Sequence, residues 1–191
     1  MRLELTTAPA SEPVTLTEAK AQCRVELSFA DDDALLTRAI QSAREEAEGM
    51  TGRVFITQTW TLKMDRFPAS QEVRISKLPL ISVTHIKYVD ENGDLQTLAA
   101  ADYVVDKSGV VPRIYLAYEK SWPVTRDEPN AIRIEFIAGY GAQAAVPGMF
   151  KSWMLLRIGE RYAHREGVVV GAIPSRVPNV DTLVLSERVG F

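Results

Sequence analysis

The hydrophobic pattern of this chain changes its period twice along the sequence, and this change most limits the folds that the chain can adopt. Apolar residues recur every three or four positions in residues 16–50, alternate with polar residues from residue 54 onward, and return to helical spacing in residues 150–162. A period near 3.6 predicts amphipathic helices, whereas a period of two predicts strands with one buried face. No helical pattern separates the strands, which excludes parallel crossover units. The sequence therefore predicts an α+β fold with a mostly antiparallel sheet.

The N-terminal region carries the start signals of two helices. Thr15 and Glu18 match a capping box, in which the two residues satisfy each other's backbone N–H groups, so a first helix begins just after Thr15. The apolar spacing places Cys23 on the packing face of that helix, with a reactive thiol as the alternative. Residues 31–33 are three aspartates ahead of a second helical stripe that ends at Gly52. Carboxylates suit a helix N-terminus because its free N–H groups attract negative charge, and a cation site is the alternative.

The middle of the chain predicts a series of short strands separated by Pro, Gly, Asn and Asp. Asn92-Gly93 predicts a hairpin with a type I′ turn, because that turn needs positive φ at both central residues. In residues 54–64 one side of the extended chain is apolar: Val54, Ile56, Trp60, Leu62 and Met64. Further strands are expected at residues 72–76, 82–89, 103–106, 113–118 and 131–137.

A third long helix is expected after Pro147, whose fixed φ suits a first helical turn. Its apolar face, formed by Phe150, Trp153, Met154, Ile158 and Tyr162, needs a partner, and the face of the second helix at Leu35, Leu36 and Ile40 is the most economical one. The expected organisation is a small helical bundle with an inserted β-domain. It divides into an N-terminal helical part (1–52), an antiparallel β-domain (53–141), a long C-terminal helix (142–166) and an extended, flexible docking arm (167–191).

Two features near the C-terminus are candidate contacts with other subunits. Arg157, Arg161 and Arg165 stand four residues apart on one face of the expected helix. This stripe is interpreted as a contact to acidic side chains of a neighbouring subunit, a contact to a phosphate backbone, or a solvated face. The arm that follows exposes apolar residues whose burial against a partner is favourable, namely Val168, Val169, Val170 and Ile173. The candidate interface therefore joins the stripe and the start of the arm.

Several functional classes are excluded or disfavoured by composition and spacing. The 22 basic against 25 acidic residues give a net charge of −3, which argues against a protein that grips nucleic acid over its whole surface. A single cysteine excludes a disulfide framework and any multi-cysteine metal site. His85 and His164 have no ligand at metal spacing and are interpreted as structural. No apolar run approaches the roughly 20 residues of a membrane helix, and the N-terminus has no signal-peptide core, so a protein made and kept in a cytosol is expected.

A glycine motif between the last strand and the third helix superficially fits a dinucleotide-binding fingerprint. Gly139-x-Gly141-x-x-Ala144 has the spacing of G-x-G-x-x-G/A. That motif needs a second parallel strand with an acidic residue about 20 positions on, whereas here the motif closes the β region and Tyr162 to His164 occupy the expected place. With no nucleophile elbow and no phosphate-binding loop, the sequence predicts no catalytic residue, no cofactor and no metal, and therefore no enzyme.

The order of several short strings resembles the tailed-bacteriophage head-to-tail connector (adaptor, or head-completion) family, which is found in prophages and gene transfer agents. The likeness covers about residues 13–166. It is carried by Pro13-Val-Thr-Leu-Thr-Glu-Ala-Lys20, Asp32-Asp-Ala-Leu-Leu36, Thr51-Gly-Arg53, Thr57-Gln-Thr-Trp60, Leu78-Pro-Leu-Ile-Ser-Val83, Tyr118-Glu-Lys-Ser-Trp-Pro123 and Phe136-Ile-Ala-Gly-Tyr-Gly141.

The resemblance implies a structural virion protein at the head-tail junction, assembled in the cytoplasm of a bacterial host. It implies a ring, typically of twelve copies, that docks on the portal protein of the capsid and extends the DNA channel toward the tail. The implied partners are the portal protein, neighbouring copies, a tail-side stopper or tail terminator protein, and double-stranded DNA that passes without sequence-specific binding. The resemblance implies no catalytic residues.

Two other classes of function remain as alternatives. One is a β-rich binding module of a virion or secretion machine, in which Trp60, Trp122 and Tyr118 form an aromatic platform with at least two of them exposed together. The other is a carboxylate-dependent hydrolase, which would show a deep pocket and an Asp or Glu with a strongly raised pKa.

Overall fold

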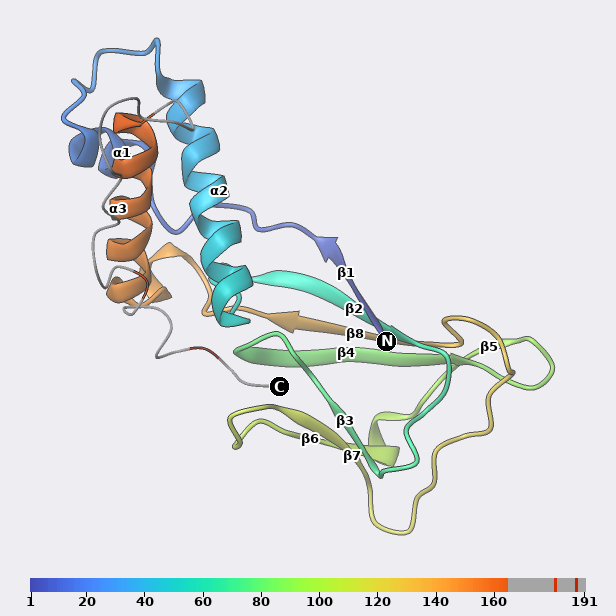
Figure 1. Cartoon of the computed structure of the whole chain (residues 1–191). Coiled ribbons are helices and arrows are strands. Elements are labelled where there is room, and N and C mark those ends of the chain that lie inside the picture. The colour runs from blue at the N-terminus through green and yellow to red at the C-terminus, as the bar shows by residue number, and fades with distance from the viewer. Residues whose placement is uncertain (165–180, 182–187, 189–191) are drawn as a thin grey trace. The chain divides into compact units, whose positions relative to one another are not determined.

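The computed structural model describes residues 1–164 together with Asp181 and Arg188. These residues form two compact units: Met1–Pro9 with Thr57–Gly139, and Ala10–Ile56 with residues 140–164 (Figure 1). The first unit consists of antiparallel sheets and the second of helices, so the α+β class is confirmed. The expected docking arm at residues 167–191 lies outside the described residues, apart from those two positions, and stays a prediction.

The larger sheet has five strands in the order β1-β2-β8-β4-β5, and every neighbouring pair is antiparallel. Its strands are β1 (Arg2–Thr7), β2 (Gln58–Met64), β8 (Ile132–Ala138), β4 (Leu80–Val89) and β5 (Leu95–Thr97). The register places Leu62, Ile134 and Ile86 side by side, and all three are buried. Residues that pair across strands share a face, so this face of the sheet belongs to the core.

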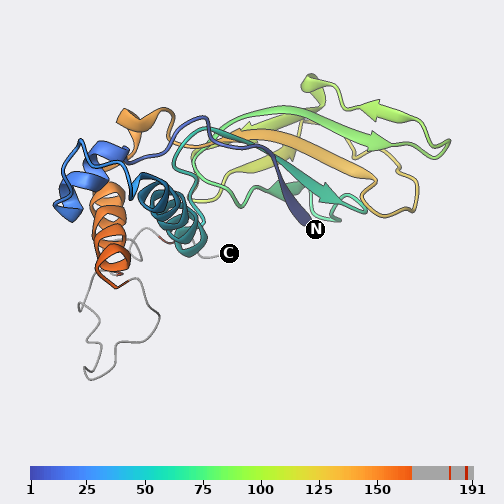
Figure 2. The ribbon, with the colours of Figure 1, turned by 90° about the horizontal axis from the view of Figure 1, so that it is seen from above.

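A smaller sheet completes the β-unit. It has the order β3-β7-β6, with β3 (Glu72–Arg74), β7 (Arg113–Leu116), β6 (Tyr103–Asp106) and a 3-10 turn η1 (Ala100–Asp102). Figures 1 and 2 show it on one side of the larger sheet. Val73 and Ile114 pair across it and are both buried. The opposite face of the larger sheet carries charged and hydroxyl side chains, which matches a sheet with one wet face.

Two local expectations about strands were wrong. The first strand of the larger sheet, β1, was not expected: it is a mostly exposed edge strand whose partner β2 lies more than 50 residues away, so no local turn indicates it. Residues 54–56 were expected to extend the second strand, but the strand begins at Gln58. Instead, Val54, Phe55 and Ile56 are buried at 0%, 0% and 3% exposure in the helical unit. Three consecutive buried apolar residues cannot come from an alternating strand with one wet face.

The expected hairpin at Asn92-Gly93 forms, but with a different turn. β4 and β5 pair antiparallel, and Gly93 has φ of 96°. Asn92 does not have positive φ, so the type I′ turn was wrong. The connection is a five-residue turn organised by Asp90, whose side chain accepts hydrogen bonds from Asn92 N and Asp94 N, both at 3.0 Å. A short polar side chain that caps its own turn removes the need for a second residue with positive φ.

The helical unit contains α1 (Leu16–Cys23), α2 (Asp33–Thr51), the 3-10 turn η2 (Gln143–Ala145) and α3 (Gly148–Ala163). α3 packs against both α1 and α2, and Figure 2 shows α2 and α3 side by side. Leu36 and Ile40 of α2 meet Phe150 and Trp153 of α3 in one core, which confirms the expected packing. Phe55 joins this core through a ring contact with Phe150, at 4.6 Å between ring centroids.

The capping box at the start of α1 is confirmed in atomic detail. Glu18 N donates to Thr15 Oγ1 at 3.1 Å, and Thr15 N donates to Glu18 Oε2 at 2.7 Å. The backbone hydrogen bond from Thr15 lowers the pKa of the Glu18 carboxyl below its ordinary value of 4.5. A carboxyl with a lowered pKa stabilises the folded state above its ordinary pKa and loses that contribution as the pH falls through the folded-state pKa.

We therefore expect Glu18→Gln to lower stability at neutral pH by about 0.5 to 1 kcal/mol, because the charged acceptor is lost. Once the pH has fallen below the folded-state pKa of the Glu18 carboxyl, the wild-type side chain is protonated as well, so the two proteins should converge. Urea unfolding over a pH series from neutral to acidic measures this difference. Glu91→Gln, at an exposed turn position, is the matched control and should show no such convergence. A gap for Glu18→Gln that is equal throughout the pH series would contradict the prediction.

Candidate functional site

The predicted arginine stripe on α3 is paired within its own chain. Arg157 Nη2 lies 2.7 Å from Glu46 Oε1 and Arg161 Nη2 lies 2.6 Å from Glu46 Oε2, so one carboxylate of α2 bridges two arginines. Arg157 Nη1 also contacts Glu160 at 2.6 Å. The hydrogen bond that Arg157 donates to Glu46 is the largest of the effects that raise the pKa of Arg157. These contacts fasten α3 to α2.

The rest of the predicted interface lies beyond the described part of the chain. Arg165, Val168, Val169, Val170 and Ile173 are outside the described residues. Among the described residues, Arg157 Nε and Arg161 Nη1 are buried without a hydrogen-bond partner, although Nη1 and Nη2 of Arg157 and Nη2 of Arg161 are engaged. The contact of this stripe with a neighbouring subunit or a portal therefore stays a prediction, and Glu46 of the same chain is its observed partner.

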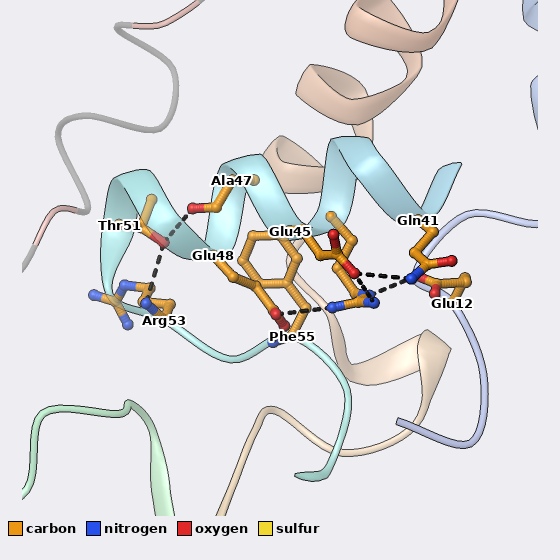
Figure 3. Close-up of polar contacts among 9 residues, drawn as sticks. Glu12, Gln41, Glu45, Ala47, Glu48, Thr51, Arg53 and Phe55 are labelled. Atoms are coloured by element: carbon orange, nitrogen blue, oxygen red, sulfur yellow. Dashed lines mark hydrogen bonds and ion pairs between the residues drawn. The ribbon is translucent and has the colours of Figure 1, made fainter. Parts of the chain in front are cut away.

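A second charged cluster lies along α2 and is almost fully buried. Arg44 has 6% exposure and contacts Glu12 at 2.7 Å and Glu48 at 3.0 Å. Burial would lower the pKa of Arg44, but the hydrogen bond with Glu12 and the charge of Glu48 outweigh it and raise the pKa. Glu48 also accepts a hydrogen bond from Phe55 N at 2.8 Å, and Figure 3 shows both residues beneath the helix. This cluster holds the segment that follows α2 in place through Phe55 N, so its role is structural.

The residues predicted to cap α2 have other partners. Asp32 occupies the N-cap position but makes no capping hydrogen bond with its side chain; instead it accepts from Tyr162 Oη at 2.6 Å. Asp33 lies 2.5 Å from Nζ of the buried Lys20. The capping role was therefore wrong for the side chain of Asp32, because tertiary partners are available to it. Among the described residues no group of His, Cys, Asp and Glu side chains could hold a metal ion.

Lys20 also holds the loop between α1 and α2. Its Nζ donates to the carbonyl oxygens of Phe29 at 2.8 Å and Leu27 at 3.2 Å. The side chains of these two residues remain exposed, at 44% and 65%. A buried ammonium group with three acceptors is satisfied in its geometry, so Lys20 is a structural residue rather than a reactive amine.

Four basic residues stand next to one another on the open face of the larger sheet. The register pairs Arg2 with Lys63, Lys63 with Arg133, and Arg133 with Lys87. Paired residues on neighbouring strands point to the same face, so these side chains form one row across β1, β2, β8 and β4. We call this set the basic row. At a strand spacing of about 4.8 Å the row is about 14 Å long.

The basic row is only partly neutralised by carboxylates. Lys63 Nζ lies 2.5 Å from Glu4 Oε2, and its hydrogen bond lowers the pKa of the Glu4 carboxyl. Glu135, in the next register position, lies 3.7 Å from His85 Nδ1. Lys87 and Arg133 form no salt bridge with any carboxylate in the described part of the chain. The row could not be predicted from the sequence, because its members come from four strands and no local motif indicates how those strands pair.

The aromatic platform proposed for a binding module does not form. Trp122 is half-buried and stacks on Phe67, with 4.5 Å between ring centroids. Trp60 is also half-buried, and Lys77 Nζ lies 4.5 Å from its ring centroid. Of the three candidate residues only Tyr118 is exposed, at 89%. The expectation of two exposed together was therefore wrong, because each tryptophan has a partner within its own unit.

Five described carboxyl groups have a pKa below the ordinary value, namely Glu4, Glu18, Glu72, Asp90 and Asp106. Hydrogen bonds to the charged form cause these shifts. Proton donation at neutral pH needs a raised pKa instead. Cys23 is half-buried, and burial raises the pKa of its thiol, which lowers its reactivity.

The glycine motif after β8 is a structural connection. Gly139 and Gly141 have φ of 135° and 125°, conformations that L side chains rarely adopt. Gly141 forms an isolated bridge with Ile56, and Tyr140 N donates to Phe55 O at 3.1 Å. The preceding strand has two antiparallel neighbours, so the parallel context of a dinucleotide site is missing.

No helix in the described part of the chain is long and apolar enough to span a membrane.

This chain is similar to known proteins in sequence and in fold. Residues 13–105 match the family model described as phage gp6-like head-tail connector protein. No curated protein matches the sequence. Three similar chains in solved structures each cover 100% of this chain and 97% of their own length. They come from the neck of an empty gene transfer agent (GTA) particle with C6 symmetry (23% identity, TM-score 0.80), the virion of a native GTA particle (22%, 0.82) and the neck of a native GTA particle with C12 symmetry (22%, 0.77).

Proposed function

We propose that this protein is a structural component that joins the head of a virion to its tail, because its residues 13–105 match the model of the phage gp6-like head-tail connector family. Copies of the chain form a ring, of twelve subunits, that docks on the portal protein and extends the DNA channel. A tail-side stopper or tail terminator protein binds the other end of the ring. The protein acts at the head-tail junction and is assembled in the host cytoplasm.

The observation that carries this proposal is the likeness over the full chain to subunits of particle necks. The whole chain aligns with the neck chain of a particle that has C12 symmetry, and the family model covers residues 13–105 independently of that fold. A ring of identical chains needs two different complementary surfaces on each copy, because such contacts are heterologous. The ring, rather than one chain, encloses the DNA.

A structural role also agrees with the chemistry of the described residues. The charged clusters of the helical unit consist of ion pairs between its own helices and loops, and its Glu18 carboxyl, with a lowered pKa, is ionised at neutral pH. Double-stranded DNA passes through the ring without sequence-specific binding. A net charge of −3 suits a conduit, because a strongly basic channel would retain DNA by counterion release.

The test is deletion of the gene for this protein, followed by examination of the particles that are then made. We expect DNA-filled heads and free tails that do not join, and restoration of complete particles when the full chain is supplied in trans. Electron microscopy of the restored particles should show a ring of this chain between portal and tail. Heads that join tails in the absence of the chain would contradict the proposal.

Deletion of residues 167–191 tests the portal contact separately. The described members of the core of the helical unit, from Val14 to Ile158, lie before this segment. We therefore expect the shortened chain to fold with a urea midpoint close to that of the full chain and to fail to join capsids in a co-sedimentation assay. The full chain is the matched control. A shortened chain that still joins capsids would place the portal contact elsewhere, and one that does not fold would assign the segment to the core.

A further inference from the structure

We propose that the basic row, on the open face of the larger sheet, is the contact surface for a second copy of this chain, which inserts its acidic β4-β5 turn there. This inference rests on the proposed function, since it names one of the heterologous contacts that a ring requires. Three observations support it: the basic row destabilises an isolated chain, both surfaces keep charges that form no salt bridge, and the two surfaces match in size.

The basic row costs stability in an isolated chain. Like charges directly opposite each other on neighbouring strands are destabilising, and Arg133 stands between Lys63 and Lys87 in the register. Arg133 is exposed and Lys87 half-exposed, and neither has a salt bridge among the described residues. The opposite face of the same strands is fully used by the core. A carboxylate surface placed against the row removes the repulsion and adds attraction.

The acidic turn between β4 and β5 is the complementary surface. Asp90 accepts hydrogen bonds from Asn92 N, Asp94 N and Gln96 Nε2 at 2.9 to 3.0 Å, and these bonds lower the pKa of its carboxyl. The side chain of Asp90 therefore holds the turn in one conformation. Glu91 and Asp94 point from this turn into solvent and have no salt bridge in the described part of the chain. The turn thus presents carboxylates in a fixed arrangement at low entropic cost.

The two surfaces also match in size and in the way they would assemble. A turn of five residues fits a row about 14 Å long, set by three strand spacings of about 4.8 Å. The row and the turn are different surfaces of the chain, so the contact is heterologous and repeats from copy to copy. Such a contact builds a closed ring when the rotation between copies closes.

Duplex DNA is the other polyanion that a basic row could bind. The proposed channel disfavours it, because phosphates held by exposed cations would be retained by counterion release rather than allowed to slide. A neighbouring copy that covers the row removes these cations from the path of the DNA. The observations therefore favour a second copy, and DNA binding becomes an outcome of the test.

The experiment is a charge exchange in the full chain. One variant reverses the row (Lys87→Glu with Arg133→Glu), a second reverses the turn (Glu91→Lys with Asp94→Lys), and a third carries all four substitutions. Self-association is measured by sedimentation equilibrium at about 0.1 M and about 1 M salt, where the Debye length falls from about 10 Å to about 3 Å. We expect wild-type association at low salt, a loss of about tenfold or more in each two-site variant, and recovery in the four-site variant.

Controls separate this contact from general charge effects. Arg66→Glu with Arg74→Glu makes the same change in net charge at two exposed positions outside the row, and should associate like the wild type. Urea unfolding should give the row variant a midpoint close to that of the wild type, because the double substitution makes the pair at positions 63 and 133 attractive but keeps like charges opposite each other at positions 87 and 133. Binding of each variant to a short DNA duplex is measured in parallel.

The outcomes decide the inference separately from the proposed function. It is overturned by a wild-type chain that stays monomeric at low salt, by a four-site variant that does not recover, or by DNA binding that only the row variants lose. If the row variant still enters complete particles at the wild-type level, the inference fails while the connector role stands. A wild-type chain that does not restore complete particles refutes the connector role whatever the association data show.

Discussion

Phe150→Ala should cost the helical unit about 3 to 5 kcal/mol of stability, the usual range for a fully buried phenylalanine reduced to alanine. Phe150 has 1% exposure and packs on Phe55, with ring centroids 4.6 Å apart, and on Tyr140, with centroids 6.0 Å apart. These partners belong to the two segments that flank the β-unit in sequence. The substitution therefore leaves a cavity where three distant parts of the chain meet. Urea unfolding followed by the helical circular dichroism signal measures the loss.

Leu156→Ala on the same helix is the matched control. Its side chain is 43% exposed, so the truncation removes little buried surface, and alanine is a strong helix former. We expect a change within about 0.5 kcal/mol. If the two variants lose equal stability, the loss comes from the helix itself and the role assigned to the Phe150 contacts is wrong.

Glu48→Ala should be the most damaging change among the charged residues, at about 3 to 5 kcal/mol. Its two carboxylate oxygens accept hydrogen bonds from Arg44 Nη1 at 3.0 Å and from Phe55 N at 2.8 Å, and both donors are buried. Alanine leaves a buried guanidinium with less compensation and a buried backbone N–H without this acceptor. The desolvation cost of these donors, rather than the worth of the ion pair, sets the size of the effect. The free energy of unfolding in urea at neutral pH checks it.

Glu45→Ala controls for the loss of one negative charge near the same arginine. Glu45 lies 3.5 Å from Arg44 Nη2, but its side chain is 57% exposed, so water replaces it when it is removed. Such exposed pairs contribute about 0 to 1 kcal/mol. Glu48→Gln, which keeps an acceptor for Phe55 N, should fall between the two. A loss for Glu45→Ala as large as that for Glu48→Ala would show that net charge, not burial, governs this cluster.

The structural elements that the sequence predicted well are those with local causes. The capping box of α1 depends on two residues three positions apart, and the apolar face of α3 repeats within its own helix. The candidate interface was harder to predict for the same reason. Arg157 and Arg161 were recognised as a stripe by their spacing, but Glu46, which pairs with Arg157 across 111 positions, is brought there only by the packing of α3 on α2.

What the sequence alone determined is therefore the class of the fold, the three helices with the capping box of α1, and the position of the β-segment between helical parts, because periodicity and capping act over a few residues. Tertiary structure decided that β1 joins the larger sheet, that Phe55 belongs to the helical core rather than to a strand, and that four basic residues lie in one row. Each of these depends on a register or a packing contact between segments far apart in the chain, and a shift of one residue in register would turn the row toward the other face.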